Sequence, residues 1–155
     1  MRVVIQRVKE ASVSVQGVKI SEIQKGLLIL VGVETQDTQQ DIDWLVAKVA
    51  KLRIFEDSLG AMNVSLQDIG ADGIVVSQFT LHASTKKGNR PSFIKAGKPE
   101  VAIPLYQEFV DSLEKQLDKK IQTGQFGAMM DVALINDGPV TITIDSKNKE
   151  QLLHI

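Results

Sequence analysis

The 155-residue chain contains no cysteine and only two histidines, which excludes several kinds of site at the outset. Without cysteine there is no disulfide, no thiolate nucleophile and no cysteine-ligated zinc. His82 and His154 do not form a closely spaced pair, and no acidic loop has the spacing of a calcium site. The sequence therefore indicates no metal and no cofactor, and a reducing compartment such as the cytoplasm is expected.

Long apolar segments are also missing. No run approaches the roughly 20 apolar residues that span a bilayer, and Arg2 and Arg7 interrupt the opening where a signal peptide needs continuous apolar residues. We therefore expect a soluble, unexported protein with no membrane partner. At 155 residues and 43% hydrophobic content, the chain is long enough for one core and too short to suggest two domains.

Charge is balanced overall but uneven along the chain. The net charge is −1, from 18 basic and 19 acidic residues, so the strong positive field of a general nucleic-acid binder is absent. The segment 82–99, however, carries five basic residues and no acidic one: Lys86, Lys87, Arg90, Lys95 and Lys98. This segment fits a phosphate-contacting patch, but charge alone favours a solvated lysine-rich loop.

Hydrophobic periodicity predicts an α/β or α+β domain with a largely antiparallel or mixed sheet. The opening residues alternate over 3–15 and lead to a hairpin turn at Gln16-Gly17, while the apolar run 27–31 predicts a central strand covered on both faces. A helix capped by Asp37 or Thr38 should follow. The other expected elements are strands at 53–56, 74–81, 131–135 and 140–144, a helix from between Pro99 and Pro104 to about 119–120, and a loose polar tail after Asp145.

Catalytic side chains are scarce in this sequence. Ser77 and Thr80 carry hydroxyls at the end of a predicted strand, but without a base they are poor nucleophiles. His82 has no carboxylate near it in sequence, so a hidden Ser-His-Asp arrangement is less favoured than a structural role for this histidine.

Two motifs carry a family resemblance. Ser77-Gln78-Phe79-Thr80-Leu81 and Asn136-Asp137-Gly138-Pro139-Val140-Thr141 resemble the signature motifs of the D-aminoacyl-tRNA deacylase family. Five other segments are similar to this family in the same order: residues 1–13, 52–57, 62–63, 87–93 and 124–128. The resemblance covers residues 1–146 as one deacylase domain and leaves 147–155 as a polar tail. Gln125 departs from it, since the family commonly has arginine there.

The resemblance implies a barrel-like single domain with two main helices that forms a homodimer. Its active site would lie where the subunits meet, with the catalytic segment Ser77, Gln78, Phe79 and Thr80 of one chain facing a cis Gly138-Pro139 turn of the other. The remaining implied substrate-binding residues are Asn136, with Phe126 and Met130 near the terminal adenosine of the tRNA. Lys86, Lys87 and Arg90 would contact the tRNA backbone.

The resemblance also gives a physical reason for the missing base. An aminoacyl ester on ribose has a neighbouring hydroxyl that can assist hydrolysis, so the protein need only position the ester and stabilise the oxyanion, through N–H groups of Phe79 and Thr80. A carbonyl of the Gly138-Pro139 turn would reject L-residues, whereas D-residues and glycine, including glycine mischarged on tRNA(Ala), would be accepted.

Two rival functions remain open from the residues alone. One is a non-catalytic module that binds nucleic acid or an aminoacyl group, which the basic segment and the poor catalytic inventory also suit. The other is a protein-based esterase with Thr80 as nucleophile and His82 nearby.

Overall fold

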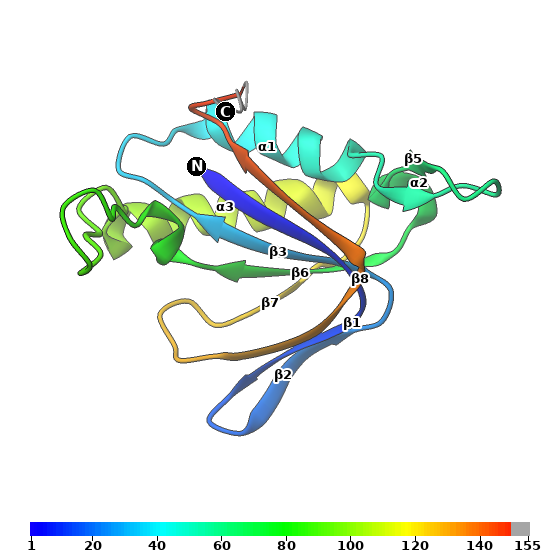
Figure 1. Ribbon diagram of the computed structural model, residues 1–155, viewed down its shortest axis with the longest axis horizontal. Coiled ribbons are helices and arrows are strands. Elements are labelled where there is room, and N and C mark those ends of the chain that lie inside the picture. Colours follow the sequence, from blue (N-terminus) through cyan, green and yellow to red (C-terminus); the bar gives the residue numbers. More distant parts are fainter. Residues whose placement is uncertain (150–155) are drawn as a thin grey trace.

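The computed structural model describes residues 1–149, which form one curved mixed sheet with two long helices packed on one face (Figure 1). In chain order the elements are β1 (Arg2–Val15), β2 (Val18–Ile23), β3 (Gly26–Gly32), α1 (Gln39–Lys51), β4 (Phe55–Glu56), β5 (Met62–Val64), α2 (Leu66–Ile69), β6 (Asp72–Ser77), the 3-10 turn η1 (Phe79–His82), α3 (Pro99–Leu117), β7 (Gln122–Thr123) and β8 (Asp131–Asp145). No helix within this part of the chain is long and apolar enough to cross a membrane.

Strand β1 organises the sheet, because it pairs antiparallel with β2, β3 and β8. β3 pairs parallel with β6, and β6 pairs parallel with β7, which gives the order β2-β1-β3-β6-β7 with β8 added on β1. The expected mixed sheet, antiparallel in most of its pairings, is confirmed.

The two ends of the sheet curl toward each other and are joined by side chains. The Glu22 N–H donates to Gln122 Oε1 at 2.7 Å, and Gln122 Nε2 donates to the Glu22 carbonyl at 2.7 Å. The Ser21 hydroxyl also donates to the Thr123 carbonyl. These bonds between β2 and β7 nearly close the sheet into the barrel-like shape that the family resemblance implies.

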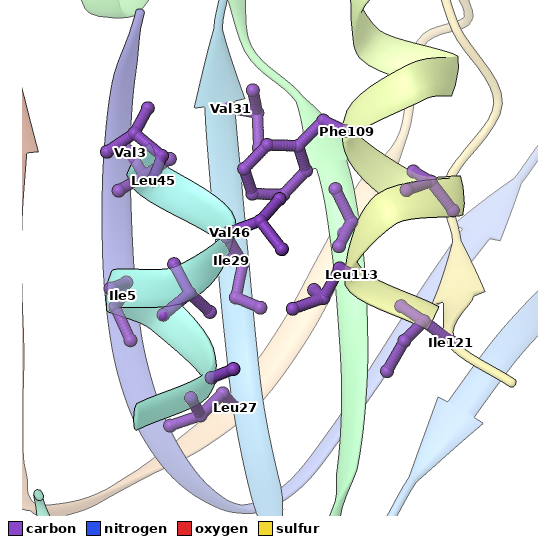
Figure 2. Close-up of a cluster of buried hydrophobic side chains, with 14 of the residues drawn as sticks. Val3, Ile5, Leu27, Ile29, Val31, Leu45, Val46, Phe109, Leu113 and Ile121 are labelled. Atoms are coloured by element: carbon purple, nitrogen blue, oxygen red, sulfur yellow. The ribbon is translucent and has the colours of Figure 1, made fainter. Parts of the chain in front are cut away.

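The central strand β3 is buried on both faces, as its continuous apolar run predicts. Leu27, Ile29 and Val31 point into the core between the sheet and the helices (Figure 2). Leu28 packs on the opposite face with Ile74 of β6, inside the curve of the sheet. Because each fully buried Leu or Ile contributes roughly 1.5–3 kcal/mol, β3 supports two cores at once.

Local sequence signals account for the ends of several elements. Gln16 and Gly17 have φ of 50° and 77°, the conformation that a two-residue hairpin turn requires. α1 begins after Thr38, whose N–H donates to Asp41 Oδ2 at 2.8 Å. α3 begins at Pro99, and it ends at Leu117, slightly earlier than expected, because Asp118 adopts the left-handed conformation with φ of 50°.

Two expectations about the strands need correction. The strand expected over 74–81 ends at Ser77, and residues 79–82 form η1 instead. The two strands expected at 131–135 and 140–144 are halves of β8, and both pair with β1. The physical reason is that β1 is long enough to serve as partner for both halves, whereas no neighbouring strand continues beside the chain after Ser77.

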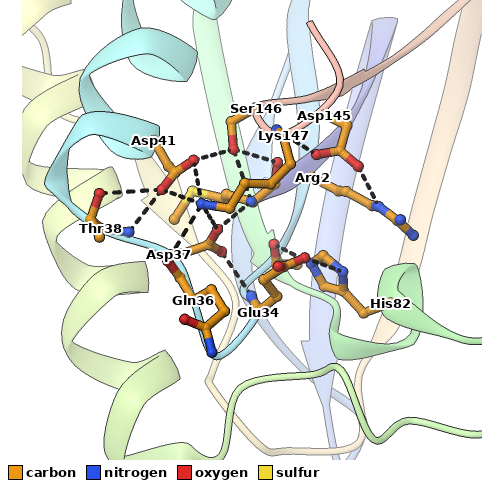
Figure 3. Close-up of polar contacts among 12 residues, drawn as sticks. Arg2, Glu34, Gln36, Asp37, Thr38, Asp41, His82, Asp145, Ser146 and Lys147 are labelled. Atoms are coloured by element: carbon orange, nitrogen blue, oxygen red, sulfur yellow. Dashed lines mark hydrogen bonds and ion pairs between the residues drawn. The ribbon is translucent and has the colours of Figure 1, made fainter.

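The tail expected after Asp145 is not loose at its start. Ser146 is buried, and its N–H donates to the Met1 carbonyl at 2.9 Å while its hydroxyl donates to Asp41 at 2.6 Å (Figure 3). Lys147 Nζ lies 2.9 Å from Asp41 Oδ2. Burial raises the pKa of Asp41, but the bonds from Ser146, Thr38 and Lys147 outweigh it and hold that pKa well below its ordinary value. Residues 150–155, including His154, lie outside the described part.

Candidate functional site

A backbone turn occupies the end of β6, where the first family motif lies. The Gln78 N–H donates to the Val31 carbonyl at 2.8 Å and makes the last bond to β3. The Leu81 N–H then donates back to the Gln78 carbonyl at 3.3 Å, which starts η1, hereafter the strand-end turn (Phe79–His82). The N–H groups of Phe79 and Thr80 precede this first bond and therefore have no partner within the turn.

His82 and Thr80 face different environments, although two positions separate them. Thr80 is exposed, and its hydroxyl accepts a bond from the Gln78 side-chain amide. His82 is buried, and its Nε2 lies 3.0 Å from the Gly32 carbonyl, which only accepts, so Nε2 carries a proton. Its Nδ1 has no hydrogen-bond partner among the described residues and lies 3.7 Å from Glu34 Oε2. This geometry favours a structural role for His82, and within residues 1–149 no base is bonded to the Thr80 hydroxyl.

Arg2 holds the strand-end turn from its far end. Its Nη1 donates to the Leu81 carbonyl at 2.9 Å. Its Nε donates to Asp145 Oδ2 at 2.8 Å (Figure 3). Burial raises the pKa of Asp145, yet the bond from Arg2 and its positive charge bring that pKa below its ordinary value. Gly32 lets the turn approach β3, since a Cβ at that position would lie only 2.9 Å from Leu81 Cβ.

An apolar cavity of about 320 Å³ opens beside the strand-end turn. Ser77, Gln78 and Phe79 line one side, and Phe126 and Met130 line another. Its volume is within the range of small-ligand sites.

Tyr106 lies in the wall of this cavity and supports its shape. Its hydroxyl donates to the Val75 carbonyl at 3.0 Å, and its ring lies 5.7 Å from that of Phe126. Burial raises the pKa of Tyr106 to about 12, so the hydroxyl stays protonated at neutral pH. Gly124 leaves room for Met130, because a Cβ at position 124 would lie 2.6 Å from the Met130 sulfur.

The second family motif forms a bulge in β8. Gln6 pairs with Thr141 and Val8 with Asn136, so residues 137–140 loop out opposite Arg7; they are called the β8 bulge below. Within it the Gly138-Pro139 peptide bond is cis, as the resemblance implies. Asn136 closes the bulge, since its Oδ1 accepts from the Val140 N–H at 3.0 Å.

Arg7 fixes the β8 bulge from the core side. It is 6% exposed, and its Nε donates to the Asp137 carbonyl at 3.1 Å while its Nη1 donates to the Ile54 carbonyl at 2.7 Å. Gly138 is exposed above it, and a Cβ there would lie 3.0 Å from Arg7 Nη2. The sequence held a signal for this residue, because Arg7 shares the buried face of β1 with Val3 and Ile5.

The strand-end turn and the β8 bulge do not meet within one chain. The bulge lies at the level of Leu27 on β3, whereas Ser77 is paired with Val31, four residues further along. At roughly 3.3 Å per residue and about 4.8 Å per strand, the two lie about 13 Å apart along the sheet and three strands apart across it. The structure thus gathers Ser77–Phe79, Phe126 and Met130, and places Asn136, Gly138 and Pro139 elsewhere.

The basic residues expected to contact tRNA lie on a separate loop. Lys86, Lys87 and Arg90 are all exposed in the segment 85–91, the basic lobe. Two backbone bonds between Ser84 and Ser92, at 2.8 and 2.9 Å, close the base of this lobe. None of the three cations forms an ion pair within residues 1–149, so their charge is available to a partner.

Comparisons with known proteins point in one direction. A family model described as D-Tyr-tRNA(Tyr) deacylase matches residues 4–145. A D-aminoacyl-tRNA deacylase of Flavobacterium johnsoniae is 67% identical over 150 residues, covering 97% of this chain and 100% of that protein. The deacylase of Bacteroides thetaiotaomicron is 59% identical with the same coverage.

Solved structures share the fold. A structure titled c-Myc DNA unwinding element binding protein has a TM-score of 0.88 and 41% identity, covering 94% of this chain and 98% of the other. A probable eukaryotic D-amino acid tRNA deacylase has a TM-score of 0.82 at 16% identity, covering 92% and 97%. This second likeness concerns the fold alone.

Proposed function

Because the chain belongs to the D-Tyr-tRNA(Tyr) deacylase family and is accordingly a hydrolase of the D-aminoacyl-tRNA ester, we propose that two subunits build each of its active sites. The observation that carries the proposal is the separation of the two motifs within one chain. The strand-end turn of one protomer faces the β8 bulge of its partner, so a homodimer holds two complete sites. A monomer with full activity would contradict this arrangement.

The substrate supplies the missing base in this proposal. The terminal adenosine occupies the apolar cavity between Phe126 and Met130, which places the ester at the strand-end turn. The neighbouring ribose 2′-hydroxyl activates water, and the N–H groups of Phe79 and Thr80 bind the oxyanion. The environments of Thr80 and His82 support this reading, since neither supplies a general base. No cofactor is required.

In this proposal the β8 bulge rejects L-residues. Gly138 and Pro139 are exposed and Arg7 fixes the backbone beneath them, so a carbonyl there can occupy the side of the α-carbon where an L side chain would lie. A D-residue or glycine presents only hydrogen on that side. The proposal therefore includes cleavage of glycine mischarged on tRNA(Ala) and rejection of L-alanine.

The basic lobe completes the proposed substrate contact. Lys86, Lys87 and Arg90 are exposed without acidic partners in the described residues, and such cations bind phosphates. They contact the tRNA backbone outside the cavity. The cytoplasm, where aminoacyl-tRNA is used, is the compartment that this proposal assigns.

A turnover experiment tests the proposal. The purified protein, at substoichiometric concentration, should release free amino acid from D-Tyr-tRNA and Gly-tRNA(Ala) and leave L-Ala-tRNA intact. The same D-aminoacyl ester on a tRNA ending in 2′-deoxyadenosine should react far more slowly. Binding of D-Tyr-tRNA without release of free amino acid would support a binding module instead, and equal rates on the deoxy substrate would exclude assistance by the 2′-hydroxyl.

A further inference from the structure

Two phenylalanines stand exposed beside the apolar cavity. Phe79 and Phe93 are 56% and 37% exposed, and their rings meet edge to face with centroids 5.0 Å apart. Phe79 lines the cavity, whereas Phe93 is not among its lining residues. The two rings therefore form an aromatic surface that extends from the cavity wall to Phe93, beside the basic lobe.

The backbone holds Phe93 in place although its ring is exposed. Ser92, immediately before it, makes two bonds with Ser84, and the Phe93 carbonyl accepts from the Ala96 N–H at 3.0 Å. Just beyond, the Gly97 N–H donates to the Val33 carbonyl at 2.8 Å. An exposed ring on a fixed backbone loses little conformational freedom when a ligand stacks on it.

Charge around Phe93 favours a polyanion. The segment 82–99 carries five cations and no acidic residue. Three of them lie on the basic lobe, and the Ser84–Ser92 backbone bonds that close this lobe directly precede Phe93. Exposed aromatic rings beside a basic track are the combination that binds unpaired nucleotides, by stacking on the bases and attracting the phosphates.

We propose that Phe93 is the stacking platform for the unpaired nucleotide that precedes the terminal adenosine of the tRNA. This inference rests on the proposed function, which places the terminal adenosine in the cavity. The preceding nucleotide then lies outside the cavity, next to Phe79, with its base on the ring of Phe93. Its phosphate lies near the basic lobe. Phe93 thus binds substrate through its base, and the lobe binds through charge.

The test compares Phe93→Leu and Phe93→Trp on three substrates: D-aminoacyl-adenosine, a D-aminoacyl trinucleotide and D-aminoacyl-tRNA. Loss of the ring should raise KM about tenfold for the two longer substrates, at the low end of what one stacked base contributes, with kcat unchanged. KM for D-aminoacyl-adenosine should stay the same. Phe93→Trp should restore the parent KM, because stacking needs an aromatic ring and not phenylalanine itself.

Ile94→Ala is the matched control, since Ile94 is the adjacent apolar residue and is 86% exposed. It should behave as the parent on all three substrates. Salt dependence separates stacking from charge: Phe93→Leu should keep the parent salt slope of tRNA binding, whereas Arg90→Ala should flatten it.

Two results would overturn the proposal: equal KM increases on the adenosine and tRNA substrates, or an unchanged KM for tRNA in Phe93→Leu. Failure of the proposed function looks different, because it appears in the parent protein itself, as full activity of a monomer or as equal rates on the substrate that ends in 2′-deoxyadenosine. In that case the affinity of the same variants for uncharged tRNA, with its unpaired 3′ nucleotides present or trimmed, still tests the platform.

Discussion

The strand-end turn and the β8 bulge differ in their surroundings but share one design. The turn borders an apolar cavity at the end of β6, while the bulge interrupts a long strand that is half exposed along its length. Each has an arginine bonded to its backbone carbonyls: Arg2 holds Leu81, and Arg7 holds Asp137. In both regions an arginine side chain fixes the position of the backbone, and in the proposed mechanism that backbone supplies the chemistry.

The largest effect should come from deleting a single N–H group of the strand-end turn. Replacing Thr80 by its α-hydroxy acid removes the N–H and keeps the side chain, and kcat should fall about 100- to 1000-fold, as for loss of one oxyanion donor. Thr80→Ala keeps the N–H and should retain most of the activity. Single-turnover kinetics on D-Tyr-tRNA measure both. If the alanine variant loses as much as the ester variant, the hydroxyl and not the backbone is catalytic.

The next effect concerns the support of the β8 bulge. Arg7→Met leaves the carbonyls of Asp137 and Ile54 without their donor, so the free energy of unfolding should fall by about 2–3 kcal/mol and cleavage of D-Tyr-tRNA should drop. Arg53→Met is the control, since Arg53 also donates two bonds, to Asn63, but at an exposed site. Urea denaturation compares them. Equal losses in both variants would mean that burial of Arg7 adds nothing.

A smaller effect is expected at the support of the strand-end turn. His82→Leu removes one bond to Gly32 while also removing the unpartnered Nδ1, so the loss of stability should be about 1 kcal/mol. Glu34→Gln leaves that bond intact and should be close to the parent. Thermal unfolding and kcat on D-aminoacyl-adenosine are the readouts. A parent-like kcat in the leucine variant would show that His82 does not position the turn.

The smallest effect concerns the pH dependence of the Arg2–Asp145 pair, which supports the strand-end turn. The pKa of Asp145 is lowered in the folded protein, so its pair with Arg2 stabilises the fold above the ordinary carboxyl pKa and loses this contribution as pH falls through the lowered value. Asp145→Asn should therefore cost about 0.5–1 kcal/mol at pH 7 and nothing at strongly acid pH. Urea midpoints measured from pH 7 to about pH 2 test this, because the loss occurs only below the ordinary carboxyl pKa. A difference that grows toward acid pH would reverse the sign of the linkage.

Local sequence patterns were sufficient to predict the elements that are determined by local interactions. The alternation along β1, the apolar run of β3 and the cap at Thr38 each predicted the observed element, because burial or a nearby hydrogen bond decides them. The cavity residues Phe126 and Met130 came instead from family resemblance. No periodicity in their segment marks a cavity wall.

The errors share a physical cause, which is contact between distant parts of the chain. Residues 78–81 have a strand-like pattern but lack a partner strand, and Ser146 is ordered by Met1, 145 positions away. Arg7 was missed as a support because its role depends on Asp137 and Ile54, neither of which is near it in sequence. Only a tertiary fold reveals such pairings.

The closure between β2 and β7 has a consequence for how the molecule opens. Side chains of Ser21, Glu22 and Gln122 join these strands, whereas backbone ladders join β1 to β3 along its length and to β8 on both sides of the β8 bulge. Side-chain bonds near the surface break at lower cost than a ladder of buried amides, so local opening begins at this seam. We therefore expect amide protons of β2 and β7 to exchange with solvent before those of β3. The sheet should open locally between β2 and β7 while β3, β6 and the turn that follows them stay closed.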